Sequence, residues 1–206
     1  MKFRTSQEEF WAGAFGDEYI DRNQSSKLIA ANTALFSKIL NRTSDIKTVI
    51  EFGSNIGLNL LAIRQLLPDA ELSAIEINER AVSILKKWGK VNVYHQSILD
   101  FKIDTQRDFV FTKGVLIHMN PETLPEVYTK LYQTSKKYIC LAEYYNPVPQ
   151  EISYRGHKEK LFKRDFAGEL LDRFSDIKLL DYGFVYRRDM QFPQDDISWF
   201  LLKKEN

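Results

Sequence analysis

The pattern of hydrophobic and polar positions predicts a strand between two helices near the start of the chain. Residues 25–40 carry apolar side chains at helical spacing, and a serine at their start can cap the first turn. Residues 47–52 form a short apolar run that ends at a glycine, which is typical of a buried strand. Residues 56–67 have the apolar content of a buried helix, and a proline follows them.

Strands and helices continue to alternate through the middle of the chain. Asn78 can cap a helix over residues 79–88, and Gly89 can end it. An apolar stripe predicts another helix over residues 121–136. Apolar runs predict further strands over residues 72–77, 91–94, 109–112 and 138–143. Because each parallel strand pair needs a crossover connection, this alternation predicts a parallel sheet with helices on both faces.

The last third of the chain has a different pattern. We expect a helix over residues 163–174, followed by apolar runs over residues 177–186 and 197–203. The polar, proline-containing connector between these two runs has no helical pattern, which favours an antiparallel pair. The sequence therefore predicts an α/β fold with a seven-stranded, mostly parallel sheet and an antiparallel strand at its carboxyl end.

Length, charge and cysteine content bound the possible functions. The 206 residues suffice for one α/β core, so we expect a single domain over residues 1–206, with a cap or lid over residues 1–24 and the core over residues 25–206. The net charge of +1 gives no general attraction for nucleic acid or an anionic membrane. The single cysteine, Cys140, excludes an intrachain disulfide and most metal sites built from cysteines, and we expect no metal ion.

The same features suggest a location and a class of partner. The first residues lack the apolar core of a signal peptide, and no apolar run approaches the roughly 18 residues that a membrane span needs. We therefore expect a cytoplasmic monomer or homodimer that acts on a small molecule or sugar.

A glycine-containing loop lies between the first predicted strand and the following helix. Gly53 and Gly57 are four residues apart, at a place where glycine permits a tight turn and close approach of a ligand. The dinucleotide pattern G-x-G-x-x-G is absent because Asn55 occupies the second glycine position. No G-K-S or G-K-T follows the loop, which excludes the phosphate-binding loop of nucleoside triphosphatases.

Glu51, Gly53 and Gly57 match the E-x-G-x-x-x-G pattern of class I S-adenosylmethionine-dependent methyltransferases, which this chain resembles. The resemblance implies a Rossmann-like fold, S-adenosyl-L-methionine as cofactor and S-adenosyl-L-homocysteine as product. It also implies that a loop passes beneath the methionine part of the cofactor, formed by Glu51, Phe52, Gly53, Ser54, Asn55 and Gly57.

Three further segments extend the expected cofactor site. Glu76 ends the second predicted strand beside Ile77, where a carboxylate can accept hydrogen bonds from both ribose hydroxyls. Taken alone, Glu76 is better explained as a charged residue at a strand end, and it is the nearby glycine loop that favours the cofactor role. Ser97 and Ile98 follow the third strand, where relatives of this fold contact adenine. The reacting methyl group is expected near the end of the fourth strand, at Lys113, Gly114 and Val115.

The first residues carry the distinctive motif F-W-x-x-x-F-G-D-x-Y-x-x-R-N over residues 10–23. Trp11 and Phe15 are four residues apart, which predicts packing on one helical face. The polar residues from Gly16 onward collect at a predicted turn and suit a lid over the cofactor. We therefore include in the cofactor site Tyr19, Arg22 and Asn23.

Together with residues 51–57, 114–121 and 163–166, this motif resembles the methyltransferases that are encoded with pseudaminic acid biosynthesis genes. That resemblance implies a bacterial cytoplasmic enzyme connected with nonulosonic sugars and with glycosylation of flagellin or surface polysaccharide. It does not specify the methyl acceptor.

Methyl transfer requires alignment of the acceptor and the cofactor, and a base can assist it. His118 is the leading candidate for the base, and orienting its loop is an equal alternative. Arg155 can pair with a sugar carboxylate, although a solvated basic loop would look the same. The expected acceptor site comprises Tyr144, Tyr145, Tyr154, Arg155 and His157.

Two other functions remain open from the sequence. A protein of this fold can bind the cofactor without catalysis and act as a scaffold, because fold alone does not fix function. An NAD-dependent sugar-modifying enzyme is disfavoured by the missing loop glycine and by the terminal hairpin.

Overall fold

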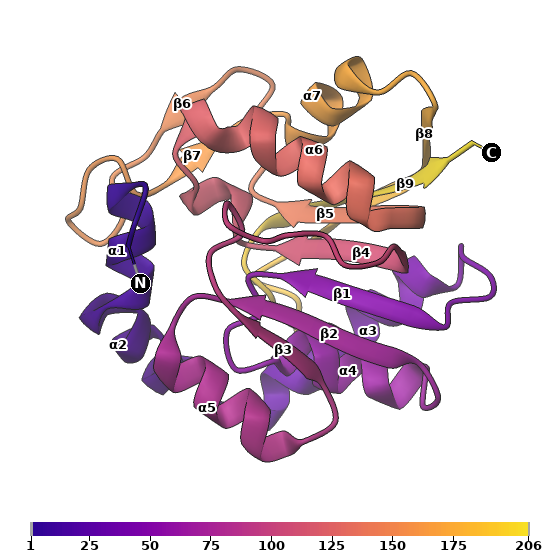
Figure 1. The fold of residues 1–206 in the computed structure, drawn as a ribbon, viewed down its shortest axis with the longest axis horizontal. Helices are drawn as coiled ribbons and strands as arrows, with labels where there is room; N and C mark the ends of the chain where they lie inside the picture. The colour runs from indigo at the N-terminus through magenta and orange to yellow at the C-terminus, as the bar shows by residue number, and fades with distance from the viewer. Residues whose placement is uncertain (1, 206) are drawn as a thin grey trace.

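The computed structural model describes residues 2–205, which form a seven-stranded sheet with helices on both faces (Figure 1). The strand order is β3-β2-β1-β4-β5-β9-β8. The strands are β1 (Thr48–Phe52), β2 (Glu71–Glu76), β3 (Asn92–His95), β4 (Arg107–Lys113), β5 (Ser135–Glu143), β8 (Ile177–Val185) and β9 (Ile197–Lys204).

The sheet is parallel except at one strand. Strands β1 to β5 pair in parallel, with Glu51 of β1 opposite Ala74 of β2 and Phe111 of β4. Strand β9 runs antiparallel to both β5 and β8. The predicted α/β class, the strand number and the antiparallel carboxyl-terminal strand are therefore confirmed.

Apolar stripes hold the helices against the two faces of the sheet. Helices α3 (Ser26–Leu40), α4 (Leu58–Leu66) and α5 (Glu79–Trp88) pack with one cluster of buried side chains, which includes Phe36, Leu60 and Leu85. Helices α6 (Leu124–Thr134) and α7 (Phe166–Arg173) pack with a second cluster, which includes Val127 and Leu170. Each cluster buries one face of the sheet.

Three predicted helix boundaries differ from the structure. The helix expected over residues 163–174 begins only at Phe166, because Phe162–Lys163 forms a short strand, β7, that pairs with β6 (Gln150–Glu151). The helix expected from residue 56 begins at Leu58, since Gly57 has a left-handed φ of 81°. The helix expected over residues 121–136 starts with a 3-10 turn and ends at Thr134, where β5 takes over.

The cap is a pair of helices, α1 (Ser6–Ala12) and α2 (Ala14–Arg22), that lies beyond the carboxyl ends of the strands (Figure 1). The prediction that Trp11 and Phe15 share one helical face is wrong, because Gly13 adopts an extended conformation and breaks the helix between them. Gly16 and Asp17 lie inside α2 and not at a turn. A side chain at Gly16 would collide with the Trp11 carbonyl oxygen, so glycine lets the two helices approach closely.

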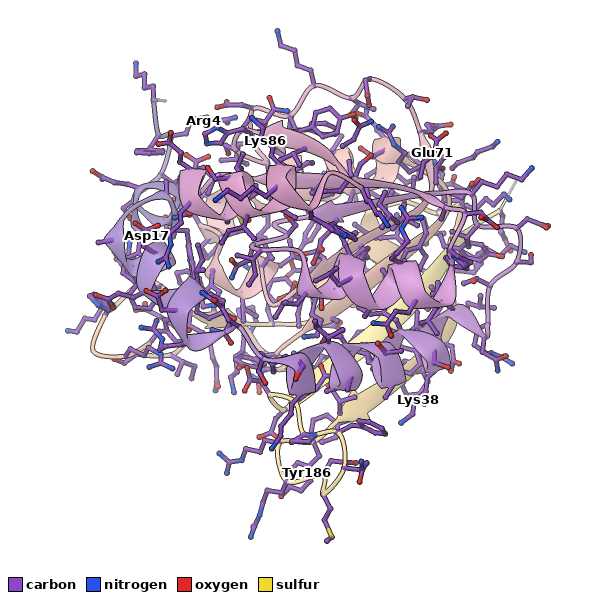
Figure 2. The ribbon with its side chains drawn as sticks, turned by 90° about the horizontal axis from the view of Figure 1, so that it is seen from below. Arg4, Asp17, Lys38, Glu71, Lys86 and Tyr186 are labelled. Atoms are coloured by element: carbon purple, nitrogen blue, oxygen red, sulfur yellow. The ribbon has the colours of Figure 1, made fainter. Side chains whose placement is uncertain are left out.

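The connection between β8 and β9 has no regular secondary structure. The connector between β8 and β9 projects from the surface around Tyr186 (Figure 2). Across residues 2–205, no helix combines the length and the apolar character that crossing a membrane requires. The same residues contain no group of three or more metal-ligating side chains arranged to hold an ion.

Candidate functional site

A cavity of about 390 Å³ opens where the parallel strands end. Because the carboxyl ends of β1, β2, β4 and β5 share one edge of the sheet, the loops that follow them meet there. The cap helices and the β8–β9 connector complete the wall. The cavity is lined by these predicted site residues: Tyr19, Asn23, Gly53, Ser54, Asn55, Glu76, Ile77, Ser97, Ile98, Lys113, Gly114, Val115 and His118.

The loop after β1 depends on two glycines for different reasons. Gly53 has a φ of 75°, and a Cβ there would lie 2.7 Å from a methyl carbon of Val115. The amide groups of Gly53 and Ser54 both donate to the Ile75 carbonyl oxygen, which ties the loop to β2. Gly57 does not line the cavity, and a Cβ there would lie 2.6 Å from Leu85 of α5. Gly53 therefore shapes the cavity, whereas Gly57 permits helix packing.

Glu76, at the end of β2, holds the loops that follow β1 and β2. Its Oε1 accepts hydrogen bonds from the amides of Ile77 and Asn78 at 2.8 and 2.7 Å, and its Oε2 accepts one from the amide of Asn55 at 2.6 Å. Burial raises the pKa of this carboxyl group, while the three amides oppose that rise. A carboxylate has about four lone-pair positions, so Oε2 retains one for a ligand hydroxyl.

Glu51 and Phe52 lie beneath the loop and do not line the cavity. Phe52 is fully buried in the core, edge-on to Phe101. Glu51 accepts a hydrogen bond from Asn59 Nδ2 at 2.6 Å, and burial raises its pKa to about 8. The two residues support the loop from beneath, and Glu51 orients Asn59, a lining residue that the sequence did not predict.

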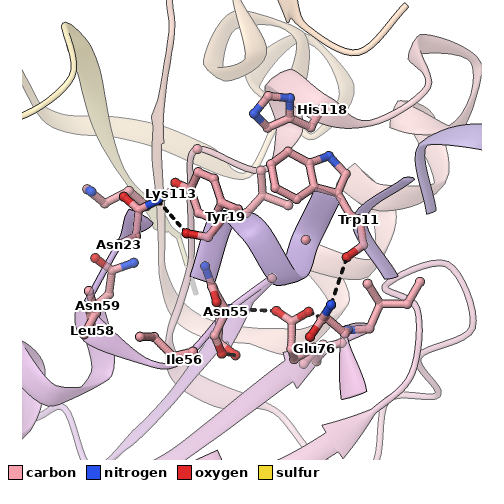
Figure 3. Close-up of a pocket in the computed structure, with 18 of the residues that line it drawn as sticks. Trp11, Tyr19, Asn23, Asn55, Ile56, Leu58, Asn59, Glu76, Lys113 and His118 are labelled. Atoms are coloured by element: carbon pink, nitrogen blue, oxygen red, sulfur yellow. Dashed lines mark hydrogen bonds between the residues drawn. The ribbon is translucent and has the colours of Figure 1, made fainter. Parts of the chain in front are cut away.

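Unpaired side-chain oxygens lie in the cavity wall and beneath it. Glu51 Oε2, Asn55 Oδ1 and Asn59 Oδ1 are buried and have no hydrogen-bond partner in residues 2–205. Lys113 lines the same cavity, where burial lowers its pKa against the attraction of Glu51 (Figure 3). The oxygens of Asn55 and Asn59 suit an ammonium group and Lys113 suits a carboxylate, so these lining residues fit the two charges of an amino acid.

The loop after β3 is hydrogen-bonded to the cap. Ser97 Oγ donates to Glu8 Oε1 and accepts from the Leu99 amide at 2.9 Å. Glu8 Oε2 accepts from the amides of Arg4 and Thr5, so Glu8 also completes the capping box of α1. The T-x-x-E spacing of that box is visible in the sequence and was the available signal for Glu8.

Glu143 holds the loop after β4. Its Oε1 accepts from the amides of Val115 and Leu116, both at 3.1 Å. Burial raises the pKa of Glu143 to about 7, although these bonds favour the ionised form. Gly114 adopts a φ of 67°, and no other atom lies within 4 Å of a Cβ built there. The backbone of this loop is thus held open toward the cavity.

His118 follows in the same loop, and its ring orientation is fixed. Nδ1 lies 2.5 Å from the Lys160 carbonyl oxygen, which can only accept, so Nδ1 carries the proton. Burial lowers the pKa of His118 to about 4, which keeps the ring neutral near pH 7. Nε2 therefore presents a lone pair. The rings of Trp11 and Tyr154 lie 4.6 and 4.8 Å from the His118 ring.

No protein-family profile and no curated protein matches the sequence. Solved structures do match the fold. Magnesium protoporphyrin IX methyltransferase from Synechocystis PCC 6803, solved with SAH, has a TM-score of 0.69 at 11% identity, over 96% of this chain and 98% of that chain. The chain has the class I methyltransferase fold.

Two further solved structures with this fold bind other molecules. The 1,6-didemethyltoxoflavin-N1-methyltransferase of Burkholderia thailandensis, with its substrate and S-adenosylhomocysteine, has a TM-score of 0.69 at 11% identity, over 97% of this chain and 87% of that one. The plantazolicin methyltransferase, with a substrate analogue and SAH, has a TM-score of 0.64 at 15% identity, over 97% and 94%. At these identities the likeness concerns the class I methyltransferase fold alone.

The remaining predicted site residues lie outside the cavity of this methyltransferase fold. The Arg22 side chain pairs with Glu18 at 3.4 Å and lies over the Phe15 ring, on the outer side of the cap. Sequence spacing could not reveal this, because α2 turns Tyr19 and Asn23 inward and Arg22 outward.

The residues expected to bind the methyl acceptor do not line the cavity. Tyr154 contacts the His118 ring, and His157 packs against Phe10 with ring centroids 5.0 Å apart. Arg155 is exposed in the turn that joins these two, with a φ of 50°. Tyr144 lies under Lys163, with Nζ 5.2 Å from the ring, and Tyr145 is exposed.

Several lining residues were not predicted because, apart from Glu8 with its capping-box spacing, they have no local pattern that indicates a cavity. They come from the cap, from α3 and α4, from the start of α5 and from the β8–β9 connector. They include Gln7, Glu8, Trp11, Asn32, Asn59, Asn78, Arg187, Gln194 and Asp195.

Proposed function

We propose that this protein is a methyltransferase that uses S-adenosyl-L-methionine, acts on a small molecule or glycan and releases S-adenosyl-L-homocysteine. The observation that carries the proposal is the polarity of the cavity. A free lone pair of Glu76 lies at the end of β2, and the unpaired side-chain oxygens of Asn55 and Asn59 line the same cavity together with Lys113. This distribution fits a ligand with ribose hydroxyls at one end and an amino acid at the other.

The residues present fit each part of the cofactor. Glu76 would accept from one ribose hydroxyl through the lone pair that Oε2 retains, and the loop at Ser97 and Ile98 would meet the adenine. The unpaired oxygens of Asn55 and Asn59 would accept from the ammonium group, and Lys113 would pair with the carboxylate. The bound cofactor supplies an electrophilic methyl group on sulfur.

The protein's own contribution is alignment and exclusion of water. The loop after β4, held by Glu143, faces the cavity between the cofactor residues and His118. The cap closes the cavity through the bond from Ser97 to Glu8 and the 2.9 Å bond from Asn78 Nδ2 to Asp17. A base near the acceptor removes its proton, and His118 is the residue we assign to that role.

We propose further that the acceptor is a nonulosonic sugar, such as an intermediate of pseudaminic acid biosynthesis, or a flagellin or surface polysaccharide that carries one. The motif over residues 10–23 supports this proposal, since it supplies both Trp11 and Tyr19 to the cavity wall. Arg187 also lines the cavity and can meet a sugar carboxylate, the role first considered for Arg155.

Calorimetric titration with S-adenosylmethionine, S-adenosylhomocysteine and NAD tests the first proposal. We expect both sulfur compounds to bind and NAD not to bind. Absence of binding by both sulfur compounds would refute the methyltransferase proposal. For the acceptor, methyl-labelled cofactor is incubated with sugar nucleotides, nonulosonic acids and flagellin. Label transferred only to acceptors unrelated to nonulosonic sugars would refute the second proposal and leave the first intact.

A further inference from the structure

A hydrogen-bond donor and an acceptor without partners lie side by side in the cavity wall. Trp11 Nε1 is buried and unpaired within the described part of the chain. His118 Nε2 carries a lone pair, because Nδ1 donates to the Lys160 carbonyl oxygen. Both residues line the cavity, and Figure 3 shows them adjacent, on the side away from Glu76.

Packing holds both rings in place. The Trp11 and His118 rings are in contact, with centroids 4.6 Å apart and planes inclined by 53°. Tyr19 packs edge-on to Trp11, with centroids 5.3 Å apart. Lys160, whose carbonyl oxygen orients His118, is tied to α1 because its ammonium donates to Ser6 Oγ at 2.9 Å. The unpaired donor and acceptor are therefore fixed features of the wall.

We propose that the methyl acceptor is a hydroxyl group, held between Trp11 Nε1 and His118 Nε2. This inference rests on the proposed methyltransferase function and specifies the reacting atom. A hydroxyl offers one proton and two lone pairs. Its proton donates to His118 Nε2, one lone pair accepts from Trp11 Nε1–H, and the second lone pair remains free to attack the methyl group.

Other nucleophiles match this pair of groups less well. An ammonium has no lone pair, and a neutral amine has one, which must attack the methyl group and so leaves the buried Trp11 N–H unpaired. A carboxylate has no proton to donate to His118 Nε2. Since burial keeps the pKa of His118 near 4, the ring brings no proton of its own to that nitrogen at neutral pH.

The bonds, the electron pair and the proton of the transfer are all accounted for by the hydroxyl, the cofactor and His118. The oxygen–carbon bond forms while the sulfur–carbon bond breaks, and the electron pair of the latter returns to sulfur. The hydroxyl proton passes to His118 Nε2 and from there to water. Because the hydroxyl becomes strongly acidic as the new bond forms, a weakly basic imidazole is sufficient.

The first test locates the transferred methyl group and removes the indole donor. Labelled methyl is transferred to the panel of sugars and glycans, and NMR identifies the methylated atom. We expect a methyl ether. Trp11→Phe keeps the ring and removes the N–H, so kcat/KM should fall about fivefold to tenfold. Trp88→Phe, in α5 away from the cavity, is the matched control and should leave kcat/KM unchanged.

Each outcome has a distinct meaning. A methylated amine or a methyl ester overturns the hydroxyl assignment while the methyltransferase function stands. Failure of S-adenosylmethionine to bind in calorimetry overturns that function itself. A crystal structure with S-adenosylhomocysteine decides the matter even without an acceptor, since water has the same donor and acceptors as a hydroxyl. A water bridging Trp11 Nε1 and His118 Nε2 supports the assignment. An indole N–H paired with protein, or no site reaching both atoms, refutes it.

Discussion

Three buried carboxylates surround the cavity, and each holds donors of a different segment. Glu76 holds the amides that follow β1 and β2, Glu143 holds those that follow β4, and Glu51 holds the Asn59 side chain. Burial raises the pKa of all three. Each carboxylate thus accepts hydrogen bonds that organise part of the cavity wall, which offsets some of the cost of its burial.

Glu76 is the residue whose loss should most weaken cofactor binding. Glu76→Gln keeps the shape and one oxygen but replaces an acceptor by a donor, which faces amide groups. We expect the dissociation constant for S-adenosylmethionine to rise at least about tenfold, which corresponds to roughly 1.4 kcal/mol. Calorimetry measures it. Glu71→Gln, at the exposed start of the same strand, is the control, and an unchanged constant for Glu76→Gln would remove Glu76 from the site.

Glu51 should make stability depend on pH in a defined direction. Its folded pKa, about 8, exceeds the usual value near 4.3, so the folded state binds more protons between these values. Its contribution is complete at pH 4 and is lost as the pH rises through 8. Glu51→Gln still accepts from Asn59 and removes this loss.

The measurement is the free energy of unfolding in urea between pH 5.5 and 7.5. We expect the stability of Glu51→Gln relative to the parent protein to rise with pH, by up to about 1.4 kcal/mol per pH unit. A parallel pH dependence of the two proteins would show that Glu51 is ionised in the folded state throughout this range.

At the scale of elements, what the sequence predicted follows from local pattern. Buried parallel strands are continuous apolar runs, so β1, β2, β4 and β5 were recognisable, and Gly53 and Glu76 could be placed at their ends. The helix break at Gly13 could not be predicted from the sequence. The residues around it have good helical spacing, and only tertiary contact makes the extended conformation favourable. Asn32 and Gln194 were missed since polar residues in a helix and a connector carry no signal of facing inward.

The turn after β1 allows a test of shape separate from backbone strain. Gly53 and Gly114 both have positive φ, at 75° and 67°, so alanine costs a similar amount of about 1 kcal/mol at either position. Only at Gly53 would the new Cβ collide with Val115. We expect Gly53→Ala to lower the melting temperature and abolish measurable cofactor binding, whereas Gly114→Ala lowers the melting temperature less and retains binding. Equal effects in the two variants would contradict a steric role for Gly53.

At the scale of the whole molecule, the cavity wall is complete only when the cap packs against the core, since both contribute lining residues. The contacts that join them include the hydrogen bond between Ser97 and Glu8, the one between Asn78 and Asp17, and the ion pair of Arg80 with Asp21. The last of these is exposed and contributes little. Of these three contacts, only the hydrogen bond from Ser97 to Glu8 is fully buried, and we refer to it as the latch between cap and core.

Loss of that latch should loosen the cap without unfolding the core. Glu8→Gln replaces a carboxylate that accepts from Ser97, Arg4 and Thr5, so α1 loses its capping charge and its strongest tie to the loop after β3. We expect amide hydrogen exchange over residues 5–22 to quicken at least about fivefold, while the core strands keep the parent rate. Glu9→Gln, exposed on the same helix, is the matched control.

Because the cap covers the cavity, S-adenosylhomocysteine should slow amide hydrogen exchange of α1 and α2 in the parent protein, and should slow it less in Glu8→Gln. If the ligand protects the sheet edge but leaves the cap unchanged, the cap is not a lid over this site.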